Sequence, residues 1–363
     1  MQTDFSVLMS LYIKEKPENF CECMESLLSQ SIPPTEIVIV KDGSLTAELE
    51  RALEGYVQRS PELYTIVPFE NNRGLGLALA EGILHCKNEL IARMDTDDVA
   101  RRDRFEKQLL EFRNDPELDI CGSHITEFEG SVDNVVAYRK VPLEDAEIKK
   151  YQKRRDAFNH MTVMYKKSAV LKAGNYQSCM LMEDTLLWVN MILSGAKCKN
   201  VDESLVFARI GRDMFERRGG FAYFKKYRQG RKRVRETGYI GFFDYYYTLL
   251  VQLVIALMPN KLRGLVFKNL IHGGLKKLKE LLPTVHLIFC TMDISIFSKG
   301  RRLLAIILSS RYRPTSSIIE KNRKSAILRT SRERRSWNLS DTLISSFPRP
   351  HGSRSAATCT SIT

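Results

Sequence analysis

The sequence lacks closely spaced cysteine pairs of the CxxC type. Its eight cysteines are scattered over 363 residues, and no two of them show the CxxC spacing that is typical of zinc sites. Neither a zinc site nor a disulfide scaffold is therefore expected. Scattered cysteines suit a reducing cytosol, in which they pack as small hydrophobic side chains.

The N-terminus has neither the basic start nor the apolar run of a signal peptide, since the chain opens with Met-Gln-Thr-Asp-Phe. We therefore expect the folded part of the chain to stay in the cytoplasm. The length allows one large α/β domain with an appendage, or two small domains. A content of 44% hydrophobic and 27% charged residues is ordinary for a globular protein.

A basic character is also lacking over most of the chain, although the net charge is +13. Residues 299–363 hold 14 Lys and Arg against 3 Asp and Glu, a surplus of 11 that leaves only +2 for residues 1–298. A nucleic-acid-binding surface needs basic residues mixed with aromatic residues on a folded face. The basic tail is rich in Ser and Thr and has no periodicity, so we expect a disordered tail and no nucleic-acid partner.

Strand-like and helix-like segments alternate along the first 210 residues. The expected strands cover residues 5–11, 36–40, 63–67, 89–94, 120–127, 163–165 and 201–209, and the expected helices cover 18–30, 47–57, 75–84, 104–114, 168–173 and 185–194. This alternation predicts an α/β fold around a central, mostly parallel sheet with helices on both faces. In such sheets ligands bind at the carboxyl ends of the strands, and the polar clusters of this sequence fall there.

The sequence changes character after about residue 211. Residues 225–235 are basic and aromatic, and residues 239–258 are almost wholly apolar apart from Asp244 and Gln252. A membrane-spanning helix needs about 20 predominantly apolar residues, and Asp244 shortens the uninterrupted run. Three interpretations stay open: an interfacial helix on anionic lipid, a helix packed on the folded domain, or a span. The predicted divisions are a folded domain over 1–235, a helical membrane-associating segment over 236–298 and a tail over 299–363.

The sharpest chemical signal is Arg-Met-Asp-Thr-Asp-Asp at residues 93–98, at the end of an expected strand. Three carboxylates in four residues repel each other, and burying them together is costly unless a cation joins them. Carboxylate oxygens are the ligands that Mg²⁺ and Mn²⁺ prefer, and these ions usually keep substrate phosphates as further ligands. The run predicts a metal site that clamps a diphosphate; the alternative is an acidic cap on the following helix.

Two other polar turns follow expected strands. Asp42, in the turn of residues 38–44, can accept hydrogen bonds from a nucleobase or ribose, although Asp-Gly chemistry also stabilises plain turns. In Asn-Asn-Arg-Gly-Leu-Gly, residues 71–76, the glycines and Arg73 can approach a phosphate near a helix N-terminus. This segment lacks the third glycine of a dinucleotide-binding fingerprint.

An acidic pair, Glu183-Asp184, opens an expected apolar helix. Acids at a helix start are favourable in themselves, but one of them can also act as a general base toward an acceptor hydroxyl. Trp188 on the same helix is expected in the core rather than as a platform for a sugar. His160 either contacts the acceptor or the metal, or is a structural histidine.

Together these segments resemble a known family pattern. Six motifs occur in order: Ser-Val-Leu-Met-Ser at 6–10, Val-Lys-Asp-Gly-Ser at 40–44, Asn-Asn-Arg-Gly-Leu-Gly at 71–76, Arg-Met-Asp-Thr-Asp-Asp at 93–98, Phe-Asn-His-Met-Thr-Val-Met at 158–164 and Glu-Asp-Thr-Leu-Leu-Trp at 183–188. The series resembles the inverting family-2 glycosyltransferases of bacterial O-antigen and capsular polysaccharide assembly, which have the GT-A fold. The resemblance covers about residues 4–235, and the ordered set is far more specific than any single motif.

The resemblance implies how the donor is bound. Asp42 would bind the base of the nucleotide, with Ser10 and Glu15 nearby. Asp95 would also bind the donor, and Arg73, a candidate from its own segment rather than from the resemblance, would contact a phosphate of the donor. The donor expected from this family is a UDP-sugar.

The resemblance also implies the metal ligands and the catalytic groups. Asp95 and Asp97 would match the DxD motif that holds Mn²⁺ or Mg²⁺, with Asp97 as the direct ligand. Asp184 would be the catalytic base. The residues themselves, rather than the resemblance, make Glu183 and His160 candidates for contacting or positioning the acceptor.

The activity implied is transfer of a hexose, galactose or glucose, to an undecaprenyl-diphosphate-linked saccharide with inversion at the anomeric carbon. The enzyme would lie peripherally on the cytoplasmic face of the bacterial inner membrane, with an anionic membrane surface as a partner. The QxxRW signature of processive synthases is absent from the sequence, so one sugar per encounter is expected.

Two departures from the family pattern and two alternatives stay open. Lys41 replaces a frequent acid before Asp42, and Leu186 stands where many relatives carry a second acid, which leaves the donor sugar undecided. A sugar nucleotidyltransferase also combines an α/β sheet with metal-binding acids, but it usually needs an N-terminal glycine-rich loop, and residues 10–18 contain no glycine. The alternative from another class is a non-catalytic basic protein that binds lipid or nucleic acid.

Overall fold

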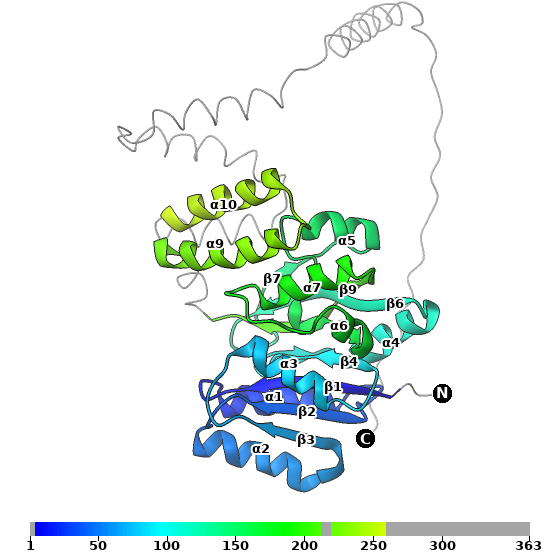
Figure 1. The fold of residues 1–363 in the computed structure, drawn as a ribbon. Helices are drawn as coiled ribbons and strands as arrows, with labels where there is room; N and C mark the ends of the chain where they lie inside the picture. Colours follow the sequence, from blue (N-terminus) through cyan, green and yellow to red (C-terminus); the bar gives the residue numbers. More distant parts are fainter. Residues whose placement is uncertain (1–3, 212–218, 259–363) are drawn as a thin grey trace, which may run out of the picture. The chain divides into compact units, whose positions relative to one another are not determined.

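The computed structural model describes residues 4–211 and 219–258 of the chain (Figure 1). Its N-terminal half consists of β1 (Phe5–Leu11), α1 (Pro17–Leu28), β2 (Glu36–Lys41), α2 (Ala47–Arg59), the 3₁₀ turn η1 (Pro61–Leu63), β3 (Tyr64–Pro68), α3 (Leu75–His85) and β4 (Leu90–Arg93). β1 pairs in parallel with β2 on one side and with β4 on the other, so that Leu8 lies beside Val38 and Arg93. The predicted alternation is confirmed here, with element ends within about two residues of those expected.

The second half mixes strand directions. Its elements are β5 (Val99–Ala100), α4 (Arg104–Asn114), β6 (Leu118–Phe128), β7 (Val135–Arg139), α5 (Asp145–Gln152), the 3₁₀ turn η2 (His160–Thr162), β8 (Met164–Lys166), α6 (Lys167–Lys172), α7 (Glu183–Leu193) and β9 (Lys197–Arg209). β8 lies antiparallel between β4 and β6, whereas β9 runs parallel to β6 and pairs antiparallel with β5. The order across the sheet is β3-β2-β1-β4-β8-β6-β9-β5, with β7 on β6. The α/β fold is as predicted, but the sheet is mixed: the run of parallel strands ends at β4, and beyond it only β6 and β9 pair in parallel. β5, β7 and α5 were not predicted.

Two apolar cores lie on opposite faces of the sheet. Val7 and Met9 of β1 belong to the core that also contains residues of α1, α2 and α4, whereas Leu8 belongs to the core with residues of α3, α6 and α7. This division follows from the alternation of side chains along a strand that is buried on both faces. At Gly82 of α3 the second core is so close that a Cβ would lie 2.4 Å from Leu8 Cδ1. Trp188 is fully buried in this core, as expected.

Two further helices, α9 (Gly220–Glu236) and α10 (Phe242–Leu257), pack against each other, and α9 packs against α7. A third apolar cluster joins them to the domain through Cys179, Met182, Leu186, Val189, Val234, Ile240 and Tyr245. In the described part of the chain no helix is long and apolar enough to cross a membrane. The predicted tail over 299–363 lies outside the described residues, as does most of the segment over 236–298.

Candidate active site

The carboxyl ends of three neighbouring strands form one edge of the sheet. Because β1 lies between β2 and β4, Ser10, Asp42 and the turn of residues 95–98 reach the same edge. A backbone hydrogen bond of 2.8 Å from Asp42 N to Leu11 O continues the pairing past the strand ends. The polar turns therefore gather where α/β sheets bind ligands.

Asp95, Asp97 and Asp98 form a cluster in which one carboxylate oxygen from each residue lies within 4.8 Å of the others. Burial, with repulsion from Asp95 and Glu15, raises the pKa of Asp97 to about 7. Asp98 is only 2% exposed, and burial with the charges of Asp95 and Asp97 raises its pKa well above the ordinary value. Carboxylates packed this closely and largely buried are the arrangement that a bound cation stabilises.

Two buried arginines, Arg93 and Arg104, fix the start of this turn. Arg93 is 1% exposed, and its Nη2 donates to Asp95 Oδ1. Arg104 of α4 is fully buried and donates from Nη2 to the carbonyl oxygen of Arg93 at 2.7 Å. The turn therefore begins from a backbone that both β4 and α4 fix.

Arg209, the last residue of β9, holds the other end of the turn. Its backbone N donates to Asp98 Oδ1 at 2.8 Å, and its Nε donates to the carbonyl oxygen of Asp97 at 2.9 Å. Asp98 Oδ2 is buried and has no hydrogen-bond partner among the described residues. Clustered carboxylate oxygens suit hard cations such as Mg²⁺ and Mn²⁺. The residues present fit a divalent ion held by Asp95, Asp97 and Asp98, and Asp98 adds a candidate ligand to the two that were predicted.

Glu15 and Ser10 lie close to the same turn or at the same sheet edge. Thr96 Oγ1, inside the acidic turn, donates to Glu15 Oε2 at 3.1 Å. Ser10 is half-buried near the end of β1, beside Val40 of β2. Their contact with a donor stays a prediction.

The carboxylate of Asp42 is buried and accepts hydrogen bonds from the loop after β3. Oδ1 accepts from the backbone N of Arg73 at 2.6 Å, and Oδ2 accepts from Gly74 N at 3.0 Å and from Asn72 Nδ2 at 2.9 Å. The guanidinium of Arg73 lies over the Phe69 ring, 4.6 Å from its centroid. Two motifs 30 residues apart therefore form one unit, whose contact with the nucleotide stays a prediction.

Glu183 and Asp184 occupy the first turn of α7. Asp184 Oδ1 accepts from the backbone N of Thr185 at 2.7 Å, and Thr185 Oγ1 donates to Asp156 Oδ1 at 2.6 Å. Burial, followed by repulsion from Asp156 and Glu183, raises the pKa of Asp184 to about 8. Burial also raises the pKa of Glu183. A carboxyl group whose pKa lies near the working pH is suited to general base catalysis.

Arg93 interacts electrostatically with both groups of acids. Against the larger effect of burial, its charge lowers the pKa of Asp97 and that of Asp184. Its Nε and Nη1 are buried and have no hydrogen-bond partner among the described residues. The cluster after β4 and the pair on α7 therefore share one buried cation.

His160 lies in η2 among aromatic residues. Its Nε2 is 2.8 Å from Tyr176 Oη, and its ring meets Trp188 edge-on at a centroid distance of 5.7 Å. Burial and the charge of Arg93 lower the pKa of His160 well below its ordinary value, so it is neutral at pH 7. These contacts favour the structural role among the alternatives, and its contact with an acceptor stays a prediction.

Sequence reasoning missed Asp156, which lies 29 residues before Thr185 and follows an unpredicted helix. It also gave no role to Arg93 or Arg209, because nothing in their local sequence shows where their guanidinium groups point. The family motif around Arg93 was the one available sign.

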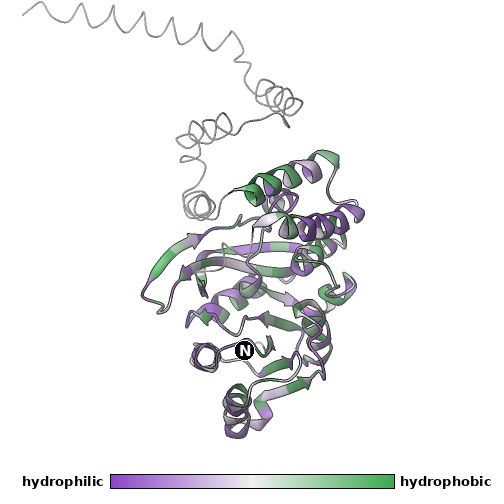
Figure 2. Ribbon diagram, turned by 90° about the vertical axis from the view of Figure 1, so that its left-hand side faces the viewer, coloured by the Kyte–Doolittle hydropathy of each residue, from purple (hydrophilic) through white to green (hydrophobic). Residues whose placement is uncertain are grey.

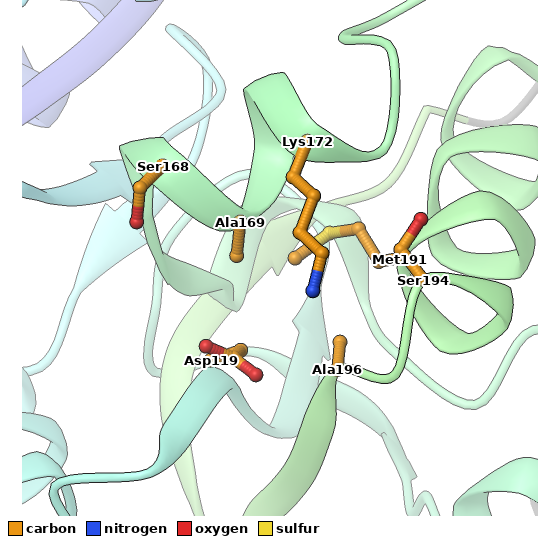
Figure 3. Close-up of a pocket in the computed structure, with 7 residues that line it drawn as sticks. All are labelled: Asp119, Ser168, Ala169, Lys172, Met191, Ser194 and Ala196. Carbon is orange, nitrogen blue, oxygen red and sulfur yellow. The ribbon is translucent and has the colours of Figure 1, made fainter.

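Figure 3 shows a small cavity beside the C-terminal end of α7. It has a volume of about 230 Å³ and is lined by Asp119, Ser168, Ala169, Lys172, Met191, Ser194 and Ala196. Met191 and Ser194 stand at the C-terminal end of α7, whereas Glu183 and Asp184 begin that helix. The cavity is therefore separate from the candidate active site.

Comparison with known proteins identifies the family. The family model for glycosyl transferase family 2 matches residues 6–172. An uncharacterized glycosyltransferase of Haemophilus influenzae is 42% identical over 258 residues, which cover 71% of this chain and 95% of that protein. The amylovoran biosynthesis glycosyltransferase AmsE of Erwinia amylovora is 36% identical, with coverage of 73% and 98%. A UDP-Gal:alpha-D-GlcNAc-diphosphoundecaprenol beta-1,3-galactosyltransferase of Escherichia coli is 32% identical, with coverage of 74% and 96%.

Among solved structures, the mannosyltransferase PcManGT from Pyrobaculum calidifontis in complex with GDP-Man and Mn²⁺ matches with a TM-score of 0.51 and 13% identity. The match covers 80% of this chain and 81% of that one and supports the GT-A fold. The chain belongs to glycosyl transferase family 2. It is a glycosyltransferase of polysaccharide biosynthesis, and the family predicted from the six ordered motifs is confirmed.

Proposed function

We propose that the protein is an inverting, metal-dependent hexosyltransferase of O-antigen or capsule repeat-unit synthesis. It moves galactose or glucose from a UDP-sugar to an undecaprenyl-diphosphate-linked saccharide. The observation that carries the proposal is the cluster of three carboxylates after β4, together with the acid pair in the first turn of α7. The charge of the buried Arg93 acts on both groups of acids. The preference for the donor and acceptor is supported by the name of the Escherichia coli relative.

In this proposal, residues at the carboxyl ends of the strands bind the donor. Asp95, Asp97 and Asp98 would hold Mn²⁺ or Mg²⁺, which when bound neutralises the charge that develops on the leaving diphosphate. Asp42 would orient the nucleotide base. The loop that Asp42 fixes leads into the N-terminus of α3, whose first N–H groups favour a nearby phosphate.

In this proposal, the acids at the start of α7 act on the acceptor. Asp184 accepts the proton of the acceptor hydroxyl while that oxygen attacks the anomeric carbon from the face opposite the nucleotide. The new bond from carbon to acceptor oxygen forms as the bond from carbon to phosphate oxygen breaks, and the UDP leaves with the electron pair. One displacement inverts the anomeric centre, so an α-linked UDP-sugar gives a β-glycoside. Glu183 and the neutral His160 would position the acceptor.

The proposal is tested with a panel of nucleotide sugars, Mn²⁺ and a synthetic GlcNAc- or GalNAc-diphosphate-lipid, with products read by mass spectrometry. We expect the mass of one added hexose with UDP-galactose or UDP-glucose. Formation of a nucleotide sugar from a nucleoside triphosphate and a sugar phosphate would instead identify a nucleotidyltransferase. No product of either kind would favour a non-catalytic protein.

Replacing Asp156 by Asn should shift the pH dependence of turnover. Removal of one negative charge that raises the pKa of Asp184 lowers that pKa. Because the base must be unprotonated, kcat rises as pH increases through this pKa, so the rising limb should move to lower pH in the variant. Profiles of kcat from about pH 6 to pH 9 measure the shift. Asp133→Asn, at an exposed position, is the control. If the rising limb of the pH profile stays in place in the Asp156 variant, Asp184 is not the base.

The helix pair α9–α10 supports membrane attachment. Residues of α10 that share its outer face are apolar or aromatic and exposed: Phe242, Phe243, Tyr246, Tyr247, Leu250 and Leu257. The neighbouring α9 is largely hydrophilic and basic (Figure 2). An apolar face flanked by basic residues fits the interface of an anionic bilayer. These features support a peripheral position on a membrane, which we propose to be the cytoplasmic face of the inner membrane.

Vesicles that contain anionic lipid should pull down the full chain at low salt, and high salt should release more of it, because part of the attraction is electrostatic. Lys225→Glu with Lys226→Glu on α9 should weaken binding, since both side chains are exposed. Arg51→Glu with Arg59→Glu on α2, at the other end of the domain in Figure 1, gives the same charge change as a control. Equal effects of the two pairs, or no binding to vesicles, would contradict the proposed surface.

A further inference from the structure

The turn before the acid pair of α7 has an unfavourable backbone conformation. Leu181 has a φ of 61°, in the left-handed region that residues with a Cβ rarely adopt. Met182 is the N-cap of α7, and its side chain makes no capping hydrogen bond. The acid pair favours a helix start here, but the local sequence does not explain the conformation of Leu181, so packing from elsewhere must hold this turn.

That packing comes from α9. Gly230 is buried, and a Cβ at its position would lie 2.3 Å from the carbonyl oxygen of Met180 and 3.1 Å from Met182 Cγ. Cys179 Sγ lies 3.9 Å from the carbonyl oxygen of Gly230. Because Gly230 has no side chain, the backbone of α9 lies directly on the turn that carries the acid pair.

Arg231, the next residue, fixes α9 in two further directions. It is 3% exposed, its Nη2 donates to the carbonyl oxygen of Lys153, and its Nε donates to Thr248 Oγ1 of α10 at 3.1 Å. Lys153 belongs to the segment that leads to Asp156. The hydroxyl of Thr185 donates to Asp156 and also lies within hydrogen-bond distance of Asp184. α9 therefore contacts both segments that place acids around the base.

We propose that α9 is a positioning element for the base of the reaction, with Gly230 and Arg231 as its positioning residues. The proposal rests on the proposed role of Asp184. Close packing of Gly230 on residues 179–182 sets the start of α7 and thus the direction of the Asp184 carboxylate. Arg231 keeps α9 at the distance that this packing requires.

The test compares Gly230→Ala with Gly55→Ala. Gly55 lies within α2, and a Cβ there would meet nothing within 4 Å, so this variant is a matched control. Hydrogen exchange read by mass spectrometry should show faster exchange around residues 179–186 only in Gly230→Ala. Turnover of that variant should fall about 10-fold to 100-fold, because a small misplacement of a catalytic group is costly. Its affinity for UDP with Mn²⁺, measured by calorimetry, should stay unchanged.

Arg231→Met keeps the apolar stem and removes both hydrogen bonds, so it makes the same test where Gly230→Ala does not fold. Unchanged turnover and exchange in these variants, or a fall of UDP affinity in step with turnover, would overturn the proposal. The exchange measurement needs no substrate. A wild-type protein without transferase activity therefore contradicts the proposed function, whereas unchanged exchange around residues 179–186 contradicts the positioning by α9.

Discussion

Replacing Asp184 by Asn should lower kcat by about 10²–10⁴-fold, the usual contribution of a general base. Asn keeps the size of the side chain and an oxygen that accepts from the backbone N of Thr185, so the start of α7 is preserved. What is lost is the capacity to take up the acceptor proton. Initial rates at saturating donor and acceptor measure the effect, and calorimetry should show nearly unchanged donor affinity.

Glu183→Gln is the matched comparison, because Glu183 is the neighbouring acid in the same helical turn. Its effect should be milder, since it alters acceptor positioning more than proton transfer. If Glu183→Gln is inactive while Asp184→Asn turns over normally, the two roles are reversed. If both variants are fully active, the base lies elsewhere, and His160 is the next residue to replace.

Asp97→Ala should abolish turnover and metal-dependent binding of the nucleotide. The expected loss is several kcal/mol of transition-state stabilisation, the scale that a bound divalent ion supplies at a phosphoryl oxygen. The fold should be retained without metal, because the substitution removes one of three mutually repelling carboxylates. Calorimetry with UDP and Mn²⁺, followed by a melting curve without metal, tests both statements.

Asp133→Ala, at an exposed position outside the acidic turn, is the control for loss of an aspartate. Asp98→Ala should weaken metal binding as well, since the free Oδ2 of Asp98 is a candidate ligand. Full turnover in excess chelator, or in the Asp97 variant, would show that the acidic cluster does not serve the reaction through a metal.

The sequence predicts the N-terminal half of the fold well, because there each strand is a short apolar run and each helix has a regular apolar stripe. Parallel neighbours then place the turns after β1, β2 and β4 at one edge without further information. For the same reason the sequence alone predicts the acidic run after β4 and its candidate role as a metal site. Beyond β4 the strands change direction, and apolar periodicity alone does not encode which neighbour a strand takes.

The parts of the site that were missed depend on contacts between distant segments. The link from Arg209 to Asp98 spans 111 residues and exists only because β9 pairs with β5 and β6. Asp156 reaches Thr185 by a similar long-range approach. Both depend on tertiary packing, which local spacing does not report.

The bonds from Asp42 to the loop after β3 have a consequence for protein engineering. Two backbone N–H groups of that loop, those of Arg73 and Gly74, take their acceptor from a residue about 30 positions earlier. Consider a chimaera that takes residues 71–76 from another family member without that member's residue 42 and flanking turn. In such a chimaera the two N–H groups can lose their hydrogen-bond acceptor. Recombination libraries for new donor sugars should therefore exchange residues 40–44 and 71–76 as one cassette.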